Sequence, residues 1–166
     1  MITCYNVISS DGYITRKDGS EDFIPDQLWS ETLKILERFD VLAMGRKTYD
    51  AIQNYDEELL EPFEKLDIEK VVVTRDKKFQ LKSGYMAVYT PEDVLRIGKN
   101  ILVLSGPTLN NYFLEKKLVD NIIFHQLPVS IGDGIRPFNT EIKKRFTLIS
   151  KTQLEQVKEL VYQVPN

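Results

Sequence analysis

Apolar residues recur along the chain in short runs of the length that β-strands bury. The runs occupy residues 2–9, 40–44, 71–75, 85–89, 101–104 and 119–127. Continuous apolar runs of this kind predict strands that are covered on both faces of a sheet. Two further candidate strands, near 146–151 and 157–164, follow one another with no helix between them. We therefore expect the chain to end in an antiparallel hairpin.

Helical patterns separate several of these runs. Apolar positions repeat at helical spacing from Pro25 to Phe39, and helix formers resume after Gly45 and after Pro107. Thr90, followed by a proline and two carboxylates, favours another helix start. Strands that alternate with helices predict an α/β fold of three layers, α/β/α, with a mainly parallel mixed sheet. At 166 residues the chain has the size of one domain, spanning 1–166.

One segment interrupts this alternation. Residues 54–69 are acidic and contain Pro62. Acidic, proline-containing connections usually run over the surface, so we expect some helix within Glu57–Lys65 and no functional site there.

Composition and charge exclude several classes of function. A formal net charge of −3, with both signs mixed along the chain, offers no basic face for nucleic acid. No segment is apolar enough to span a bilayer, and the N-terminus carries no secretion signal, so we expect a cytoplasmic protein. Cys4 and His125 are the single cysteine and histidine, and both lie in apolar runs. This pattern favours buried structural side chains and predicts no metal site.

Two strand ends pass through a glycine directly into a helix start, at Met44-Gly45-Arg46 and at Leu104-Ser105-Gly106-Pro107. Such a turn exposes backbone N–H groups at the positive end of a helix dipole, which suits a phosphate. Both turns lie at the carboxyl ends of predicted parallel strands, where open α/β sheets place their ligands. The two turns could therefore hold one diphosphate between them, although a glycine in this position often only ends the strand and permits the turn.

A third strand end adds groups that suit a phosphate. Thr74 and Arg75 supply a hydroxyl and a guanidinium, and Arg46 and Lys47 add positive charge at the first glycine turn. Any of these cations could instead be an ordinary surface residue. The chain contains neither G-x-G-x-x-G nor G-x-x-x-x-G-K-[ST], so a dinucleotide would have to bind by another route.

The order of these motifs resembles that of the dihydrofolate reductase-like family, most closely its branch with the reductase domain of bacterial riboflavin biosynthesis. The resemblance is carried by Met44-Gly45-Arg46-Lys47-Thr48-Tyr49, Val71-Val72-Val73-Thr74-Arg75, Ser105-Gly106-Pro107-Thr108-Leu109, Ser9-Ser10-Asp11-Gly12-Tyr13-Ile14 and the 128–134 segment. It implies a dihydrofolate reductase-like fold with NADPH as hydride donor, and a possible homodimer. The family usually has a second glycine where this chain has Ser105, and serine is disfavoured at positive φ.

The same resemblance implies a set of cofactor-binding residues. The first glycine turn and the second one would meet the diphosphate from two sides, and the Thr-Arg pair would meet the adenosine 2′-phosphate. The residues at matching positions are Gly45, Arg46, Lys47, Thr48, Thr74, Arg75, Ser105, Gly106, Pro107, Thr108 and Leu109.

Reduction of an imine also needs a proton for the nitrogen, which a carboxyl of raised pKa can supply. Asp26 is the nearest match to the acidic residue that holds the pterin in dihydrofolate reductases, although an aspartate in a first helical turn is ordinary dipole chemistry. Asp11 competes for a catalytic role, but Asp-Gly is also a common hairpin signal. We interpret Asn6 and Trp29 as substrate-pocket candidates, with a core position as the alternative for Trp29.

The sequence thus supports two hypotheses of different classes. The first is an NADPH-dependent reductase of a small heterocycle, either a pterin such as dihydrofolate or a ribosylaminopyrimidine. No riboflavin-type deaminase segment precedes residue 1 of this sequence, which weighs modestly against the pyrimidine. The second is a non-catalytic nucleotide-binding or dimerisation domain that retains the reductase fold.

Overall fold

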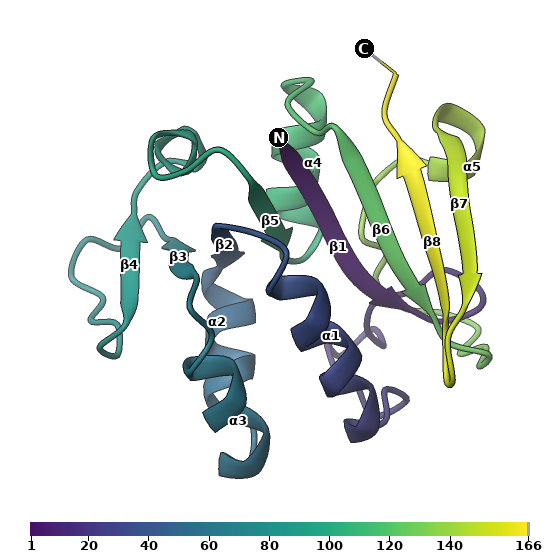
Figure 1. The fold of residues 1–166 in the computed structure, drawn as a ribbon, viewed down its shortest axis with the longest axis horizontal. Coiled ribbons are helices and arrows are strands. Elements are labelled where there is room, and N and C mark those ends of the chain that lie inside the picture. Colours follow the sequence, from purple (N-terminus) through teal and green to yellow (C-terminus); the bar gives the residue numbers. More distant parts are fainter. Residues whose placement is uncertain (166) are drawn as a thin grey trace.

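The computed structural model describes residues 1–165, and within them eight strands form one sheet in the order β4-β3-β2-β5-β1-β6-β8-β7 (Figure 1). The strands are β1 (Ile2–Ile8), β2 (Val41–Gly45), β3 (Glu69–Val73), β4 (Tyr85–Val88), β5 (Ile101–Leu104), β6 (Asn121–Gln126), β7 (Thr147–Gln153) and β8 (Lys158–Gln163). Strands β1 to β6 pair in parallel, whereas β8 is antiparallel to both β6 and β7. The predicted mainly parallel sheet with an antiparallel C-terminal hairpin is confirmed.

Helices cover both faces of this sheet. They are η1 (Asp26–Leu28), α1 (Trp29–Leu36), α2 (Arg46–Gln53), α3 (Glu57–Glu64), η2 (Pro91–Arg96), α4 (Pro107–Glu115) and α5 (Ile142–Arg145). Helices α1, α2 and α3 pack on one face, and η2, α4 and α5 pack on the other (Figure 1). The molecule is therefore the three-layer α/β/α structure that the sequence predicted.

Alternation of side chains along each strand explains why both faces need a cover. Cys4 packs into the core beneath α4, and its neighbour Tyr5 packs into the core beneath α1. The same alternation occurs in β5, where Leu102 faces α1 and Val103 faces α4. Because successive strand residues point to opposite faces, a continuous apolar run fills two cores at once.

Two segments that the sequence predicted as α-helices contain 3₁₀ helix. One begins with a 3₁₀ turn, and the other is 3₁₀ over its whole length. The segment after Pro25 opens as η1, where Leu28 N donates to Pro25 O at 3.0 Å, before α1 continues to Leu36. The segment after Thr90 stays 3₁₀ throughout, and its start is fixed by Asp93, whose Oδ2 accepts from Thr90 Oγ1 at 2.8 Å. Short 3₁₀ turns are common at helix starts and in connections, and apolar spacing does not distinguish them from an α-helix.

No helix among residues 1–165 is both long and apolar enough to cross a membrane.

Candidate active site

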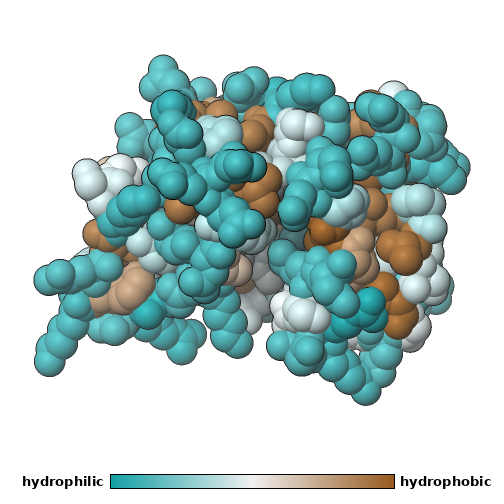
Figure 2. Space-filling model, turned by 90° about the horizontal axis from the view of Figure 1, so that it is seen from below, coloured by the Kyte–Doolittle hydropathy of each residue, from teal (hydrophilic) through white to brown (hydrophobic). Residues whose placement is uncertain are grey.

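A cavity of about 1080 Å³ lies beyond the carboxyl ends of the central parallel strands. Its floor is formed by the ends of β1, β2, β3 and β5, and its walls come from α1, α2, the N-terminus of α4 and the loop of residues 14–26. Figure 2 looks onto this end of the molecule and shows a largely hydrophilic surface that is hollowed between two lobes. The volume exceeds that of a typical small-ligand pocket, so it has room for a dinucleotide together with a substrate.

The structure brings nearly all of the predicted site residues to this one cavity. Those that line it are Asn6, Asp26, Trp29, Gly45, Arg46, Lys47, Thr48, Thr74, Arg75, Ser105, Gly106, Pro107, Thr108 and Leu109. Asp11 does not line it.

The two glycine turns place two helix N-termini at the cavity. Gly45 caps α2 and Gly106 caps α4, and a glycine has no side chain that could bond to the first-turn N–H groups of its helix. Those N–H groups are therefore available to a ligand in the cavity, except at Pro107, the first residue of α4, which has no N–H. A Cβ added at Gly106 would meet no protein atom within 4 Å, so the space beside this turn is open.

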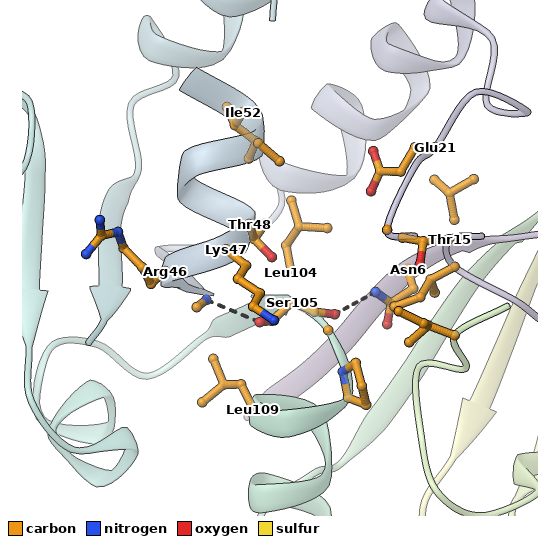
Figure 3. A pocket seen from close by; sticks show the side chains of 18 of the residues that line it. Asn6, Thr15, Glu21, Arg46, Lys47, Thr48, Ile52, Leu104, Ser105 and Leu109 are labelled. Atoms are coloured by element: carbon orange, nitrogen blue, oxygen red, sulfur yellow. Dashed lines mark hydrogen bonds between the residues drawn. The ribbon is translucent and has the colours of Figure 1, made fainter. Parts of the chain in front are cut away.

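Ser105 ties the two turns together. Its Oγ accepts a hydrogen bond from Gly45 N at 3.2 Å, which joins the turn before α4 to the turn before α2 (Figure 3). Lys117 is the one non-glycine residue between residues 1 and 165 with positive φ, so Ser105 has an ordinary backbone conformation. The sequence-based concern about serine at positive φ does not apply, and the hydroxyl takes a structural role instead.

Two asparagine amides hold the carbonyl group of the Ser105 turn. Asn6 Nδ2 donates to Ser105 O at 2.8 Å (Figure 3). Asn110 Nδ2 donates to the same oxygen at 3.1 Å and to Asn6 Oδ1 at 2.9 Å. Asn6 and Asn110 are both buried. Although Asn6 lines the cavity as predicted, its amide is already engaged in positioning the turn.

The two cations of the first turn point in different directions. Arg46 Nε pairs with Asp50 Oδ2 at 3.0 Å, and its guanidinium carbon lies 3.1 Å from the centre of the Phe79 ring. Figure 3 shows Arg46 directed away from Ser105, whereas Lys47 extends over the turn. Lys47 is therefore the cation of this turn that is better placed for a ligand between the two helix N-termini.

Thr74 and Arg75 lie at the end of β3, on the side of the cavity next to α2. Thr74 is buried, and its Oγ1 accepts from Asp76 N at 3.2 Å, which fixes the turn that follows β3. Arg75 is exposed and lines the cavity. A guanidinium presented from such a fixed turn suits a phosphate at the cavity rim.

Asp11 has a structural position outside the cavity. Its carboxylate accepts hydrogen bonds from Ser9 Oγ at 2.6 Å, Ser130 Oγ and Gly132 N at 2.8 Å, and Ile131 N at 3.2 Å. Partial desolvation alone would raise its pKa, but these four hydrogen bonds together hold the pKa of Asp11 well below its usual range. Asp11 therefore joins the N-terminal loop to the 130–132 loop as an ionised group, and Asp11-Gly12 lies in a turn in which Gly12 N donates to Ser9 O at 3.0 Å.

Three carboxyl groups line the cavity, Asp18 and Glu21 from the loop before η1 and Asp26 from η1. Asp26 is exposed at the start of η1, as predicted. Glu21 was not predicted from the sequence, and it faces the cavity beside Tyr55, whose hydroxyl lies 3.5 Å from Glu21 Oε2 (Figure 3). Its surface is accessible from the cavity, yet the surrounding walls desolvate the carboxyl and raise its pKa, which the Tyr55 hydrogen bond opposes.

The segment 54–69 contributes to the cavity, contrary to the prediction that it carries no site. Tyr55 and Leu59 line the wall, and α3 forms within the expected limits. Trp29 Nε1 donates to Leu59 O at 2.7 Å, and the Trp29 ring packs edge-on against Tyr55 at 5.3 Å. No residue pattern marks this contact in the sequence, because it depends on how α3 folds back onto α1.

In the part of the chain that the structure describes, no group of three or more histidine, cysteine, aspartate or glutamate side chains could hold a metal ion. The cavity thus offers backbone N–H groups, hydroxyls, cations and three carboxyls. This chemistry suits an anionic ligand with a neighbouring polar reactant.

Comparison with solved structures defines the class of fold. The chain superposes on the dihydrofolate reductase of Enterococcus faecalis, solved with NADP(H) and RAB-propyl, with a TM-score of 0.72 and 11% identity over 100% of this chain and 97% of that one. A Thermotoga maritima diaminohydroxyphosphoribosylaminopyrimidine deaminase/5-amino-6-(5-phosphoribosylamino)uracil reductase gives a TM-score of 0.73 and 10% identity. That match covers 99% of this chain but 56% of the Thermotoga protein, so the chain corresponds to about half of it. The fold is dihydrofolate reductase-like.

The sequence comparison identifies the family. Residues 1–162 match the RibD C-terminal domain family, and the chain belongs to it. It is also 25% identical over 156 residues to the uncharacterized protein YyaP of Bacillus subtilis (strain 168), covering 85% of this chain and 81% of that protein. The resemblance seen in the sequence motifs is thus confirmed.

Proposed function

We propose that this protein is an NADPH-dependent reductase of a small heterocyclic substrate, either a pterin or a ribosylaminopyrimidine. The observation that carries the proposal is the meeting of two uncapped helix N-termini at one cavity, tied together by Ser105 Oγ and Gly45 N. Membership of the RibD C-terminal domain family supports a reductase, as does the fold shared with a dihydrofolate reductase solved with NADP(H).

The residues present fit NADPH. The first-turn N–H groups of α2 and α4, with Lys47, would hold the diphosphate, and Thr74 with Arg75 would hold the 2′-phosphate. When bound, NADPH would supply a hydride. The open space at Gly106 is where the cofactor backbone could approach the turn closely.

The substrate would occupy the part of the cavity between β1 and α1. Trp29 and Tyr55, whose rings meet edge to face, supply an aromatic wall for a heterocycle, and Thr32, Asp26 and Glu21 supply polar groups. Glu21 and Asp26 are the carboxyls beside this wall that could hydrogen-bond the heterocycle, and the raised pKa of Glu21 favours a protonated carboxyl that donates such a bond.

The proposal is tested by following the loss of NADPH absorbance with dihydrofolate and, separately, with a ribosylated aminopyrimidine. We expect turnover with one of them, and a loss of at least about tenfold in kcat for Glu21→Gln. Glu58→Gln, an exposed carboxyl on α3 that does not line the cavity, is the matched control and should retain wild-type activity.

A folded protein that gains thermal stability from NADPH but turns over neither substrate would contradict the reductase. That result would favour the alternative, a nucleotide-binding or dimerisation domain that retains the fold. No stabilisation by any nicotinamide nucleotide would contradict both the cofactor and the reaction.

A further inference from the structure

A continuous chain of hydrogen bonds leads from the cavity through the core to the surface beside β8. Thr32 Oγ1 lies 2.9 Å from Tyr5 Oη, and the same Tyr5 oxygen lies 3.0 Å from His125 Nδ1. At the other side of the ring, His125 Nε2 lies 3.1 Å from Glu159 Oε2. Thr32 and Tyr5 line the cavity, and the Glu159 side chain is 15% exposed.

Four separate elements assemble this chain. Tyr5 belongs to β1, His125 to β6, Glu159 to β8 and Thr32 to α1, and His125 and Glu159 are direct cross-strand partners. The Tyr5 and His125 rings meet edge to face at 5.1 Å, and neither residue has any solvent-accessible surface. Burying these polar groups costs free energy that apolar residues of similar shape would avoid. The chain joins the cavity to solvent without a gap, which a purely structural histidine would not require.

We propose that Thr32, Tyr5, His125 and Glu159 form a proton relay that carries protons from solvent to the reacting nitrogen of the substrate. This inference rests on the proposed reductase function. Thr32 is the member placed to touch the substrate, and the other three act through it as positioning residues.

Each transfer along the relay conserves atoms and charge. Bound NADPH would supply a hydride to the substrate C=N carbon, and the electron pair of the double bond would then form the new N–H bond with the proton of Thr32 Oγ1. Tyr5 Oη–H then returns a proton to Thr32, and His125 Nδ1–H returns one to Tyr5. His125 Nε2 takes up a proton that enters from water by way of Glu159. One hydride and one proton reach the substrate. Thr32, Tyr5 and Glu159 recover their starting protonation, whereas His125 ends with its proton on Nε2, and a turn of the imidazole ring restores the starting arrangement before the next turnover.

Burial in the protein core favours the uncharged forms of Tyr5 and His125. Burial lowers the pKa of His125, which the hydrogen bond to Glu159 opposes, and burial also raises the pKa of Tyr5. The charged groups that face the histidine are Glu159 from β8 and Glu31 and Arg38 from α1 and its C-terminal end. A neutral imidazole and two hydroxyls can each donate and accept, so a proton can pass along them without a buried charge persisting.

The kinetic test uses both ends of the relay. With the turnover assay above, Glu159→Gln and Thr32→Val should each lower kcat by at least about tenfold and change its pH dependence, with the Kd of NADPH unchanged. Thr32→Ser retains the hydroxyl and should lower kcat less than Thr32→Val does. Glu155→Gln, an exposed carboxyl in the same β7–β8 hairpin, is the matched control for Glu159. A wild-type kcat and pH profile in Glu159→Gln would overturn the relay.

A second readout needs no turnover, because the chain has a single histidine and its ring gives one set of NMR signals. The relay predicts that Thr32→Val alters the His125 ring ¹⁵N shifts and pKa through the Tyr5 hydroxyl, and has no such effect in a Tyr5→Phe background. Unchanged His125 signals in Thr32→Val would overturn the relay. If no substrate is reduced, the proposed function fails, while this measurement still decides whether Thr32, Tyr5 and His125 are coupled through their hydrogen bonds.

Discussion

At the scale of single residues, the cavity depends on side chains that bond to the backbone of its turns. Ser105 Oγ accepts from Gly45 N, and Asn6 Nδ2 donates to Ser105 O. Each bond restricts the conformation of a turn that would otherwise be free to move. The two helix N-termini are thus held in place before a ligand arrives, which lowers the ordering cost of binding.

Asp11 is expected to act on stability and not on the reaction. Replacing it by asparagine removes the charge from a group that accepts four hydrogen bonds, so Asp11→Asn should lower the free energy of unfolding at pH 7 by about 1–2 kcal/mol. Urea denaturation measures this loss. The folded variant should retain wild-type kcat, and a large fall in kcat with unchanged stability would contradict the structural role.

The pH dependence of this effect has a defined sign. The folded-state pKa of Asp11 lies below its unfolded value, so its stabilisation is present above the ordinary aspartate pKa of about 3.9 and is lost as the pH falls below it. The stability difference between the wild type and Asp11→Asn should therefore be constant from pH 7 to pH 5 and shrink towards pH 3.

The lowered pKa of His125 predicts that the free energy of unfolding also depends on pH in a second, higher pH range. Its folded-state pKa is lowered by burial, so below about pH 6.5 the unfolded chain binds a proton that the folded protein does not. The free energy of unfolding should fall as the pH drops from 6.5 to 5, and an NMR titration of the single histidine should give a pKa below the ordinary value. A pKa above 6.5 would contradict this account.

At the scale of secondary-structure elements, the strands were the most predictable feature. Continuous apolar runs such as 101–104 mark buried strands directly, because both faces of the sheet are covered. The strand–glycine–helix turns at Gly45 and Gly106 were also predictable, since glycine interrupts an apolar run and a helical pattern resumes. The 3₁₀ character of η1 and η2 was not, because it depends on local hydrogen bonds that apolar spacing does not encode.

Gly106 offers a test of the α4 turn. Its φ of −79° is open to any residue, and an added Cβ would meet no protein atom within 4 Å. Gly106→Ala should therefore change the free energy of unfolding by less than about 1 kcal/mol, while a methyl group in the cavity should weaken NADPH at least about tenfold. Urea denaturation and fluorescence titration with NADPH measure the two effects.

Gly45→Ala provides the contrast. Its added Cβ would lie 3.0 Å from Ser105 Oγ, so this variant should lose stability as well as NADPH affinity. An NADPH affinity in Gly106→Ala equal to that of the wild type would contradict the placement of the cofactor at this turn.

At the scale of the whole molecule, the cavity depends on contacts between segments far apart in the sequence. Asn6, Trp29 and the glycine turns could be predicted because each lies within or beside a regular element. Glu21 and Tyr55 could not, because a loop and a connection carry them to the cavity by tertiary packing. Tertiary packing also places β8 between β6 and β7, which joins Glu159 to His125.

The central claim is that the three turns together hold the phosphates of NADPH. Its most direct test is the titration of NADPH and NADH into the wild type, Arg75→Ala and Lys78→Ala by isothermal calorimetry. Lys78 is an exposed cation after the same strand that does not line the cavity. The wild type and Lys78→Ala should bind NADPH at least about tenfold more tightly than NADH, and Arg75→Ala should lose most of this preference by weakening NADPH alone. Equal affinities of the wild type for NADPH and NADH would contradict the assignment of the 2′-phosphate to Thr74 and Arg75.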